Sequence, residues 1–421
     1  MRILHAPSNT ANQAWYAAKG LRALGHDVEV WQYGESRFAF PADRVVDTSS
    51  RDPKPVWDAF VEAIGRFDVF HFHFARSLIP DWVRVPFLWD LPILRVLGKK
   101  IFFTFHGVDC TVRAIHERTN PWSYFRYSDI EADDEFILKR THTIRTYADE
   151  MFVVSPGYAP FVPDARWVPR IIDLSEWPEQ DADIRPVPQV LHIPSRRGKK
   201  GTDMILRGLE TLRAEGLAFD ISLVENVPHE EAKRRIREAD IVIDNVLTGD
   251  YEVVSMETMA SGRVAVAKMS QEIIAAYGGD VPVYNVDPDT FLERMRALIK
   301  DRTLCLDLAR RGRTHVARHH DAPVVAATLA ERYSAAGPKF PRRAFPDWIS
   351  AGDERKLEDL DDRVATLTED PAAFAEANAA LQRRIAKLER SVAGAGRPSW
   401  KRLIPPAARK RLAAMRWRAP R

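Results

Sequence analysis

The chain contains 421 residues, of which 45% are hydrophobic and 29% are charged. This composition is typical of a soluble globular protein with two or three domains. Its two cysteines, Cys110 and Cys305, fit no metal-ligand spacing. The sequence contains no run of about 18 apolar residues, so no membrane-spanning helix is predicted. The apolar stretch at the N-terminus is too short for a secretory signal. We therefore expect a cytoplasmic protein.

Residues 1–175 are predicted to form an N-terminal domain in which strands and helices alternate. A helical pattern over residues 14–24 ends at Gly25, a residue type that often terminates helices. Such alternation is typical of a parallel sheet covered by helices on both faces. Short apolar runs predict strands at residues 3–6, 28–31, 67–73, 100–106, 151–155 and 166–169.

A second alternating region follows a segment that is rich in proline and charge. Residues 176–188 contain three prolines, and we interpret them as a domain linker. Residues 189–320 then predict a second α/β domain, and residues 321–336 have a helical pattern. Further strands are predicted at residues 190–193, 221–224, 241–243 and 264–267, and further helices at residues 291–300 and 303–318.

Residues 190–262 are the most informative segment. An apolar strand leads into a cationic loop and a helix, and a later strand and loop lead into a helix that carries Glu257. A helix N-terminus attracts anions, and Arg197 and Lys200 add full positive charges. The Glu257 carboxylate can accept both hydroxyls of a ribose. The pattern predicts a nucleoside diphosphate site; the alternative for the two cations is an exposed basic loop.

This segment resembles the donor half of a GT-B glycosyltransferase, specifically of glycosyltransferase family 4. Arg197 and Lys200-Gly201 match the loop that grips the donor pyrophosphate in that family. Glu257, followed by residues 259–262, matches the helix that holds the sugar and the ribose. The resemblance covers about residues 1–336. It implies two Rossmann-like domains that face a cleft, with residues 321–336 as a helix crossing back to the first domain.

The chain departs from the family pattern at one acid. The family usually has a second glutamate eight residues before the one at position 257, where this chain has Gly249. Asp250 and Glu252 are the nearest acids, but neither is in register. The family's base-binding loop corresponds to the segment at Val227. The resemblance implies that the backbone of Val227 contacts the donor base. A helix start with acids in its first turn is the alternative interpretation there.

Histidines follow or occupy two strands of the first domain. His106 comes directly after a strand, where ligands of parallel sheets bind. The resemblance implies that His106 faces the donor sugar and the acceptor; the alternative is a loop histidine with a local hydrogen bond. His71 and His73 share one strand face. A metal site there would need a third ligand, so we interpret His73 as either an acceptor-side residue or a buried histidine.

The loop at residues 6–13 replaces the Gly-Gly turn that is common in the family. Ser8, Asn9 and Asn12 are candidates to hydrogen-bond a phosphate or an acceptor hydroxyl. The acid pair Asp133-Asp134 lies in a charged helical stretch instead of at a strand end. We interpret that pair as a solvated surface and expect no metal site.

The C-terminal residues carry two further patterns. Heptads between Leu357 and Leu388 predict a coiled coil over residues 353–392 and a homo-oligomer; a single amphipathic helix is the alternative. Residues 391–421 contain nine Lys and Arg and no acid, although the net charge of the chain is only +3. Because Trp400 and Trp417 accompany this charge, we expect the basic tail at residues 393–421 to bind an anionic membrane surface. Nucleic-acid binding and disorder are the alternatives for the tail. For the protein as a whole, we expect no nucleic-acid partner.

The resemblance implies transfer of a hexose or similar sugar from a nucleotide-diphosphate donor to a carbohydrate or lipid-linked acceptor. It also implies retention of the anomeric configuration. Polysaccharide biosynthesis is the expected process, with peripheral association at the inner face of the membrane. No cofactor or metal is expected beside the nucleotide sugar. The alternatives are a non-catalytic GT-B-shaped assembly protein and a sugar-nucleotide epimerase.

Overall fold

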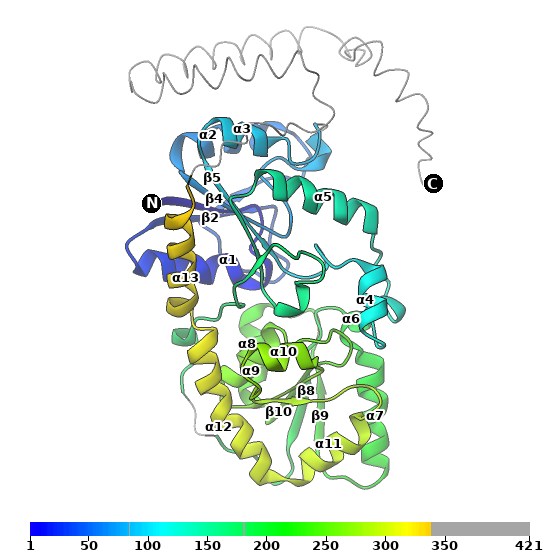
Figure 1. The fold of residues 1–421 in the computed structure, drawn as a ribbon. Coiled ribbons are helices and arrows are strands. Elements are labelled where there is room, and N and C mark those ends of the chain that lie inside the picture. Colours follow the sequence, from blue (N-terminus) through cyan, green and yellow to red (C-terminus); the bar gives the residue numbers. More distant parts are fainter. Residues whose placement is uncertain (84, 180–181, 338–421) are drawn as a thin grey trace, which may run out of the picture. The chain divides into compact units, whose positions relative to one another are not determined.

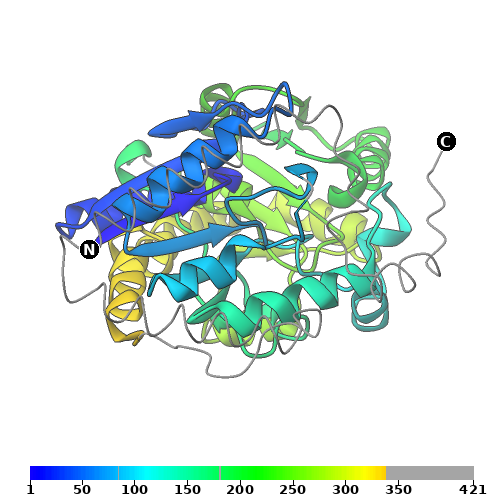
Figure 2. The same ribbon diagram turned by 90° about the horizontal axis from the view of Figure 1, so that it is seen from above.

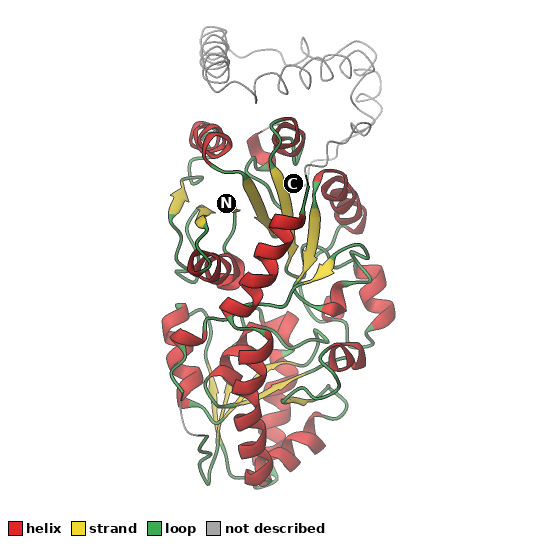
Figure 3. Ribbon diagram, turned by 60° about the vertical axis from the view of Figure 1, so that its left-hand side comes forward, coloured by secondary structure: helices red, strands yellow, loops and turns green. Residues whose placement is uncertain are grey.

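Two parallel β-sheets, each accompanied by helices, form the part of the chain that the computed structural model describes, residues 1–83, 85–179 and 182–337 (Figures 1 and 3). The predicted coiled coil at residues 353–392 and basic tail at residues 393–421 lie outside these residues. Within them, no helix is both long and apolar enough to cross a bilayer.

The first sheet has seven strands in the order β3-β2-β1-β4-β5-β6-β7, and every neighbouring pair is parallel. The central strand β4 is buried at all five positions, as expected for a strand covered on both faces. Figure 2 shows this domain from above, with helices around its strands. The elements are β1 (Arg2–Ala6), α1 (Gln13–Ala23), β2 (Asp27–Tyr33), β3 (Arg44–Val46), α2 (Lys54–Arg66), β4 (Val69–His73), α3 (Asp90–Val96), β5 (Lys100–Phe105), α4 (Arg113–Thr119), α5 (Asp134–Tyr147), β6 (Glu150–Val153) and β7 (Arg166–Trp167).

The second sheet has five strands in the order β12-β11-β10-β8-β9, again all parallel. Strands β10 and β11 are fully buried; β11 is apolar throughout, and β10 begins with three apolar residues before Asp244 and Asn245. The two parallel sheets confirm the predicted α/β class. The elements are β8 (Gln189–His192), α6 (Arg197–Lys200), α7 (Thr202–Ala214), β9 (Asp220–Leu223), α8 (His229–Glu238), β10 (Ile241–Asn245), α9 (Val253–Ala260), β11 (Val264–Ala267), α10 (Gln271–Ala276), β12 (Val283–Asn285), α11 (Phe291–Lys300) and α12 (Arg302–His319).

The last described helix, α13 (Ala322–Ala335), leaves the second domain and packs on α1 of the first (Figure 1). The helices approach closely at Gly20, where an added Cβ would lie 2.5 Å from Cβ of Ala326. Where α13 begins, the chain runs beside the segment that leaves the first domain. The Ile172 N–H donates to the His320 carbonyl at 2.9 Å, and the Ala322 N–H donates to the Ile172 carbonyl at 2.9 Å.

Candidate active site

A cavity of about 650 Å³ lies at the carboxyl ends of strands from both sheets. Ligands of parallel α/β sheets bind at such edges, because the loops that leave the strands converge there. Side chains of the first domain form one wall, and the loops after β8, β9 and β10 form the other. The sequence candidates that line the cavity are Ser8, His106, Lys200, Val227, Glu252 and Glu257.

Lys200 is buried at the end of α6, with 3% of its surface exposed. Its ammonium group bonds to Asp244, and it lies 2.5 Å from Oε2 of Glu252. Burial opposes the charged form, but the two carboxylates outweigh it and raise the pKa of Lys200. Lys200 is therefore a charged cation held in place by two acids.

Of the cations next to Lys200, two line the cavity and one lies outside it. Arg196 and Lys199 line the cavity, and Nζ of Lys199 lies 2.7 Å from Oε1 of Glu252. Arg197 does not line it. Its guanidinium bonds to Glu225 at 2.8 Å and to Asp203 at 2.9 Å. Because α6 begins at Arg197 and Arg196 is extended, these neighbouring side chains take different directions, which the sequence pattern did not resolve.

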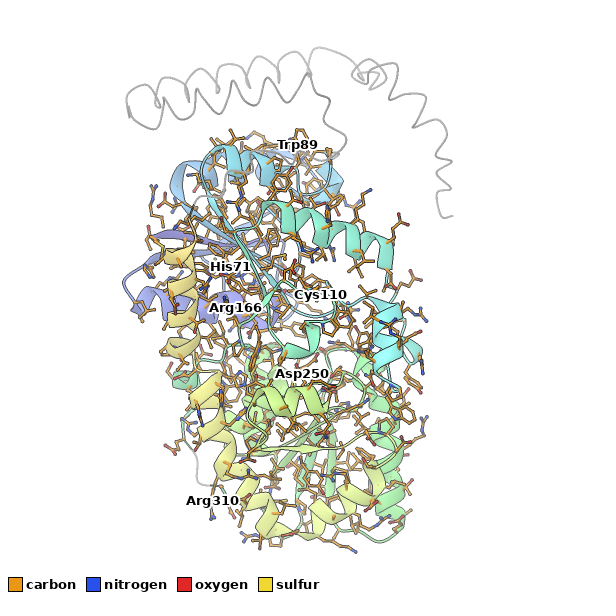
Figure 4. The ribbon with its side chains drawn as sticks, in the orientation of Figure 1. His71, Trp89, Cys110, Arg166, Asp250 and Arg310 are labelled. Atoms are coloured by element: carbon orange, nitrogen blue, oxygen red, sulfur yellow. The ribbon has the colours of Figure 1, made fainter. Side chains whose placement is uncertain are left out.

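The two acids that follow Gly249, Asp250 and Glu252, also have different positions relative to the cavity. Gly249 has a φ of 83°, a left-handed conformation that favours glycine, so it supports a turn. Asp250 bonds to Arg170 at 2.7 Å, an ion pair that joins the two domains, and it is not a lining residue. Glu252 lines the cavity, and Lys199 and Lys200 lower its pKa despite its burial. In the side-chain view, His71 is labelled in the first domain and Asp250 in the second (Figure 4).

Glu257 is 3% exposed on α9 and lies opposite the start of α8. Its Oε1 is 2.5 Å from Nε2 of His229, a residue to which the sequence reasoning gave no role. The His229 ring in turn meets the Phe40 ring edge-on, with centroids 5.1 Å apart. Because Val227, Phe40 and His229 all line the cavity, this corner combines an apolar surface with a carboxylate.

The half-buried His106 begins a chain of imidazoles that continues through the buried His73 and His5 into the first sheet. Its Nε2 lies 3.0 Å from Nδ1 of His73, and Nε2 of His73 lies 2.9 Å from Nδ1 of His5. Burial lowers the pKa of all three rings, that of His73 to about 3, so the chain is neutral at pH 7. The turn after β5 is fixed by Asp109, whose carboxylate accepts from the N–H groups of His106 and Gly107.

Strand pairing places a third histidine, His5, beside His71 and His73, a proximity that the spacing in the sequence did not indicate. His5 is the register partner of His71, and the three side chains place one nitrogen each within 4.8 Å of one another, close enough to hold a metal ion. Hydrogen bonds use both ring nitrogens of His71 and of His73 and Nδ1 of His5, whereas Nε2 of His5 makes none in the described part of the chain. His71 bonds to Tyr333 and, at 2.6 Å, to Thr104. We therefore interpret the cluster as a hydrogen-bonded network behind His106.

The loop after β1 contributes Ser8 to the cavity wall, while two other candidates stabilise the loop itself. The Asn9 amide donates to Oδ1 of Asn12 and to the Pro41 carbonyl, both at 2.9 Å. Both asparagines are buried and neither lines the cavity. The acid pair 133–134 lies elsewhere, where Asp133 caps α5 by accepting from the Phe136 N–H at 2.9 Å.

Comparison with known proteins shows the fold. No family model matches the sequence, and no curated protein matches it either. Among solved structures, Anabaena HepE in complex with UDP and glucose is similar, with 12% identity, a TM-score of 0.55 and coverage of 80% of this chain and 100% of HepE. Sucrose-phosphate synthase from Thermosynechococcus elongatus has 13% identity, a TM-score of 0.55 and coverage of 79% and 98%. A glycosyltransferase from Rickettsia africae has 14% identity, a TM-score of 0.51 and coverage of 79% and 97%.

These similarities, together with the two facing parallel sheets, define the architecture. The chain has the GT-B fold of nucleotide-sugar-dependent glycosyltransferases. Identities this low establish the fold alone.

Proposed function

We propose that the protein transfers a sugar from a nucleoside diphosphate donor to a carbohydrate or lipid-linked acceptor. The observation that supports this most is the composition of one cavity between two Rossmann-like domains. Three cations and a buried acid of the second domain face a histidine of the first. They are Arg196, Lys199, Lys200, Glu257 and His106.

The cations suit a diphosphate leaving group. Negative charge grows on the diphosphate as its bond to the sugar breaks, and groups that bind this charge more strongly in the transition state accelerate transfer. Lys199 and Lys200 share the carboxylate of Glu252. Arg196 has no carboxylate within salt-bridge distance in the described part of the chain, so we assign it the role that the sequence pattern gave to Arg197.

The remaining residues suit the rest of a nucleotide sugar. Glu257 can accept ribose hydroxyls, and the apolar surface at Val227 and Phe40 can pack on the base. His106 contacts the transferred sugar from the opposite domain, and closure of the cleft would exclude water. We further propose retention of the anomeric configuration and transfer without a metal ion. Nuclear magnetic resonance of the first-formed product would show its anomer, and loss of activity in EDTA that magnesium restores would refute metal independence.

Thermal unfolding with UDP, GDP, ADP and their sugars tests the donor site, because a ligand of the folded state raises its stability. We expect one nucleotide to raise the melting temperature, Arg196→Ala to abolish this shift, and Arg197→Ala to retain it. Retention in Arg196→Ala with loss in Arg197→Ala would contradict our assignment. Stabilisation by none of the nucleotides would contradict the donor site.

The acceptor step needs a separate measurement. With donor and an acceptor mixture, a transferase forms glycosylated product and free nucleoside diphosphate. An altered sugar nucleotide formed without acceptor would identify an epimerase. Donor binding without turnover in the full chain, over an acceptor set of carbohydrates and lipid-linked sugars, would identify a non-catalytic assembly protein.

A further inference from the structure

A second cavity, of about 420 Å³, lies in the first domain beside the candidate active site. Segments that follow β1, β3 and β4, the end of β2, and one face of α5 line it. Ser8 and Arg76 line both cavities, so the two cavities adjoin at these side chains. A ligand in the second cavity would therefore adjoin whatever occupies the first.

Two arginines face this second cavity without an ion-pair partner among the described residues. Arg76 is exposed, with its guanidinium 5.6 Å from the centre of the Phe74 ring. Arg140 is half-buried on α5 and donates from Nη2 to the Asp109 carbonyl at 2.5 Å. Burial lowers the pKa of Arg140, the charges of Asp109 and Asp81 raise it in part, and the nearby charge of Arg76 lowers it. Two guanidinium groups that line one cavity without a salt bridge favour an anion beside them.

Two buried polar atoms of the same cavity also lack a partner in the described structure. Nε of Arg140 and the hydroxyl of Tyr33 are shielded from solvent and make no hydrogen bond. Both side chains line the second cavity. Buried polar groups normally have hydrogen-bond partners. Each of these atoms therefore has unused hydrogen-bonding capacity in the wall of this cavity.

Aromatic side chains complete the wall. Trp82, Phe87 and Phe136 line the cavity beside the arginines. Aromatic rings with a few convergent polar groups are the usual surface for binding an organic ligand, and a sugar presents both apolar faces and hydroxyls. The only carboxylate in the lining is that of Asp81, which makes no salt bridge in the described part of the chain.

We propose that the second cavity is the acceptor subsite and that it takes an acceptor sugar carrying an anionic group. Arg76 and Arg140 bind the anion, Tyr33 bonds a hydroxyl, and the aromatic rings pack on the sugar. This inference rests on the proposed transfer reaction, which would occur where Ser8 and Arg76 line both cavities. The anion is either the carboxylate of a uronic acid or the phosphate that joins a sugar to a lipid carrier.

The test uses the full chain saturated with its nucleoside diphosphate, so that the donor site is occupied. Affinity is measured calorimetrically for methyl glucuronide, methyl glucoside and a sugar diphosphate with a short prenyl chain. We expect one anionic probe to bind at least about tenfold more tightly than the neutral glucoside, a ratio in the range of charge-assisted hydrogen bonds. The glucuronide and the prenyl diphosphate distinguish the two sources of the anion.

Arg140→Gln and Arg76→Gln should each reduce the ratio of anionic to neutral probe affinity to about one. Arg145→Gln is the matched control, because Arg145 lies on the same helix but pairs with Asp164 at 2.8 Å and lines neither cavity. Arg76 is exposed, so its variant tests the subsite even if Arg140→Gln does not fold.

Equal affinity for neutral and anionic probes, or a preference that both arginine variants retain, would overturn the proposal. Failure of the proposed transfer reaction would give a different experimental result. If no nucleotide binds but the anionic probe still requires Arg76 and Arg140, the anion subsite stands and the transferase assignment falls.

Discussion

Glu252 and Lys200 form a buried ion pair, with Oε2 of Glu252 2.5 Å from Nζ of Lys200. The second oxygen of Glu252 lies 2.7 Å from Nζ of Lys199, so one carboxylate holds two cavity cations. The family pattern would place an acid at position 249, but Gly249 supports a turn there. Glu252 therefore brings the acidic group to the cavity from the N-terminal end of α9.

Replacing Glu252 with glutamine should lower stability and strengthen anion binding. The variant keeps the side-chain shape but leaves Lys199 without its carboxylate, while Asp244 still compensates Lys200. We expect a loss of about 2–4 kcal/mol in the free energy of unfolding, together with tighter binding of the nucleoside diphosphate. Urea unfolding and calorimetric titration measure the two effects.

Asp149→Asn is the control for this experiment. Asp149 pairs with Arg95 at 2.9 Å in the first domain, at a position more buried than the pair of Lys199 with Glu252. It should lower stability in the same way and leave nucleotide affinity unchanged. Weaker nucleotide binding in Glu252→Gln than in the unmodified protein would mean that Glu252 itself contacts the ligand.

Acid should destabilise the protein through its buried histidines. Burial lowers the pKa of His73 from 6.5 to about 3, so between these values the unfolded chain binds a proton that the folded chain does not. The free energy of unfolding therefore falls as the pH falls through this window, by up to about 1.4 kcal/mol per pH unit for each such histidine. Burial also lowers the pKa of His320 to about 3 and of His116, His192 and His315 to about 4.

Two buried carboxyl groups have the opposite effect on how the free energy of unfolding depends on pH. Burial raises the pKa of Asp90 and Asp109 to about 6, so the folded chain binds the extra protons between pH 3.8 and 6 and loses this stabilisation as the pH rises. The histidines outnumber them, so net loss on acidification is expected. Urea unfolding from pH 6.5 to 4 should show a shallower slope for His73→Phe, but an unchanged slope for Phe103→Leu, a core substitution with no titratable group. Equal slopes in all three proteins would contradict the linkage to His73.

The contact between α1 and α13 should not tolerate a side chain at position 20. A Cβ at Gly20 would lie 2.5 Å from Cβ of Ala326 and 2.6 Å from the Ala322 carbonyl oxygen. Gly20→Ala should therefore lower the free energy of unfolding by about 1–3 kcal/mol through overpacking. Gly65, in helix α2, has no neighbouring atom within 4 Å of an added Cβ, and Gly65→Ala should stabilise by about 0.5–1 kcal/mol. Effects of the same sign in chemical unfolding would contradict the close packing of α1 and α13.

The sequence predicts the strands of the fold better than the directions of its side chains. Residues 264–267 form a strand as predicted, because an apolar run between polar segments has few other ways to be buried. The segment around β3, residues 44–46, was not predicted, since its three residues are too few to give a pattern. Lys200 and Glu257 line the cavity, whereas Arg197 points to solvent and Arg196 lines the cavity instead. Arg196 precedes α6 in extended backbone, whereas Arg197 is the first residue of the helix, so the two side chains leave the chain in different directions. The sequence pattern does not fix the residue at which this short helix begins.

Contacts between residues distant in sequence were also beyond reach of the sequence pattern. His5 and His73 meet across 68 positions because β1 and β4 are neighbours in the sheet. The pairing of Glu257 with His229 likewise depends on how α8 packs beside α9. Neither relation follows from local periodicity.

The pairing of Glu257 with His229 leads to a prediction about the ribose. Oε1 of Glu257 lies 2.5 Å from Nε2 of His229, so the second oxygen, Oε2, remains to accept ribose hydroxyls in the cavity. A glutamine at position 257 keeps the shape but loses the charge. Charge-assisted hydrogen bonds are roughly twice as strong as neutral ones. Glu257→Gln should therefore weaken nucleoside diphosphate binding about tenfold.

A ligand analogue separates this role from a general effect on folding. The 2′,3′-dideoxy form of the same nucleotide lacks both hydroxyls, so the unmodified protein and Glu257→Gln should bind it equally weakly. His229→Asn tests whether the imidazole orients the carboxylate, and it should lower affinity only for the nucleotide with a complete ribose. If Glu257→Gln weakens the binding of both nucleotides by the same factor, Glu257 does not bind the ribose, and its contact with His229 serves the packing of α8 on α9.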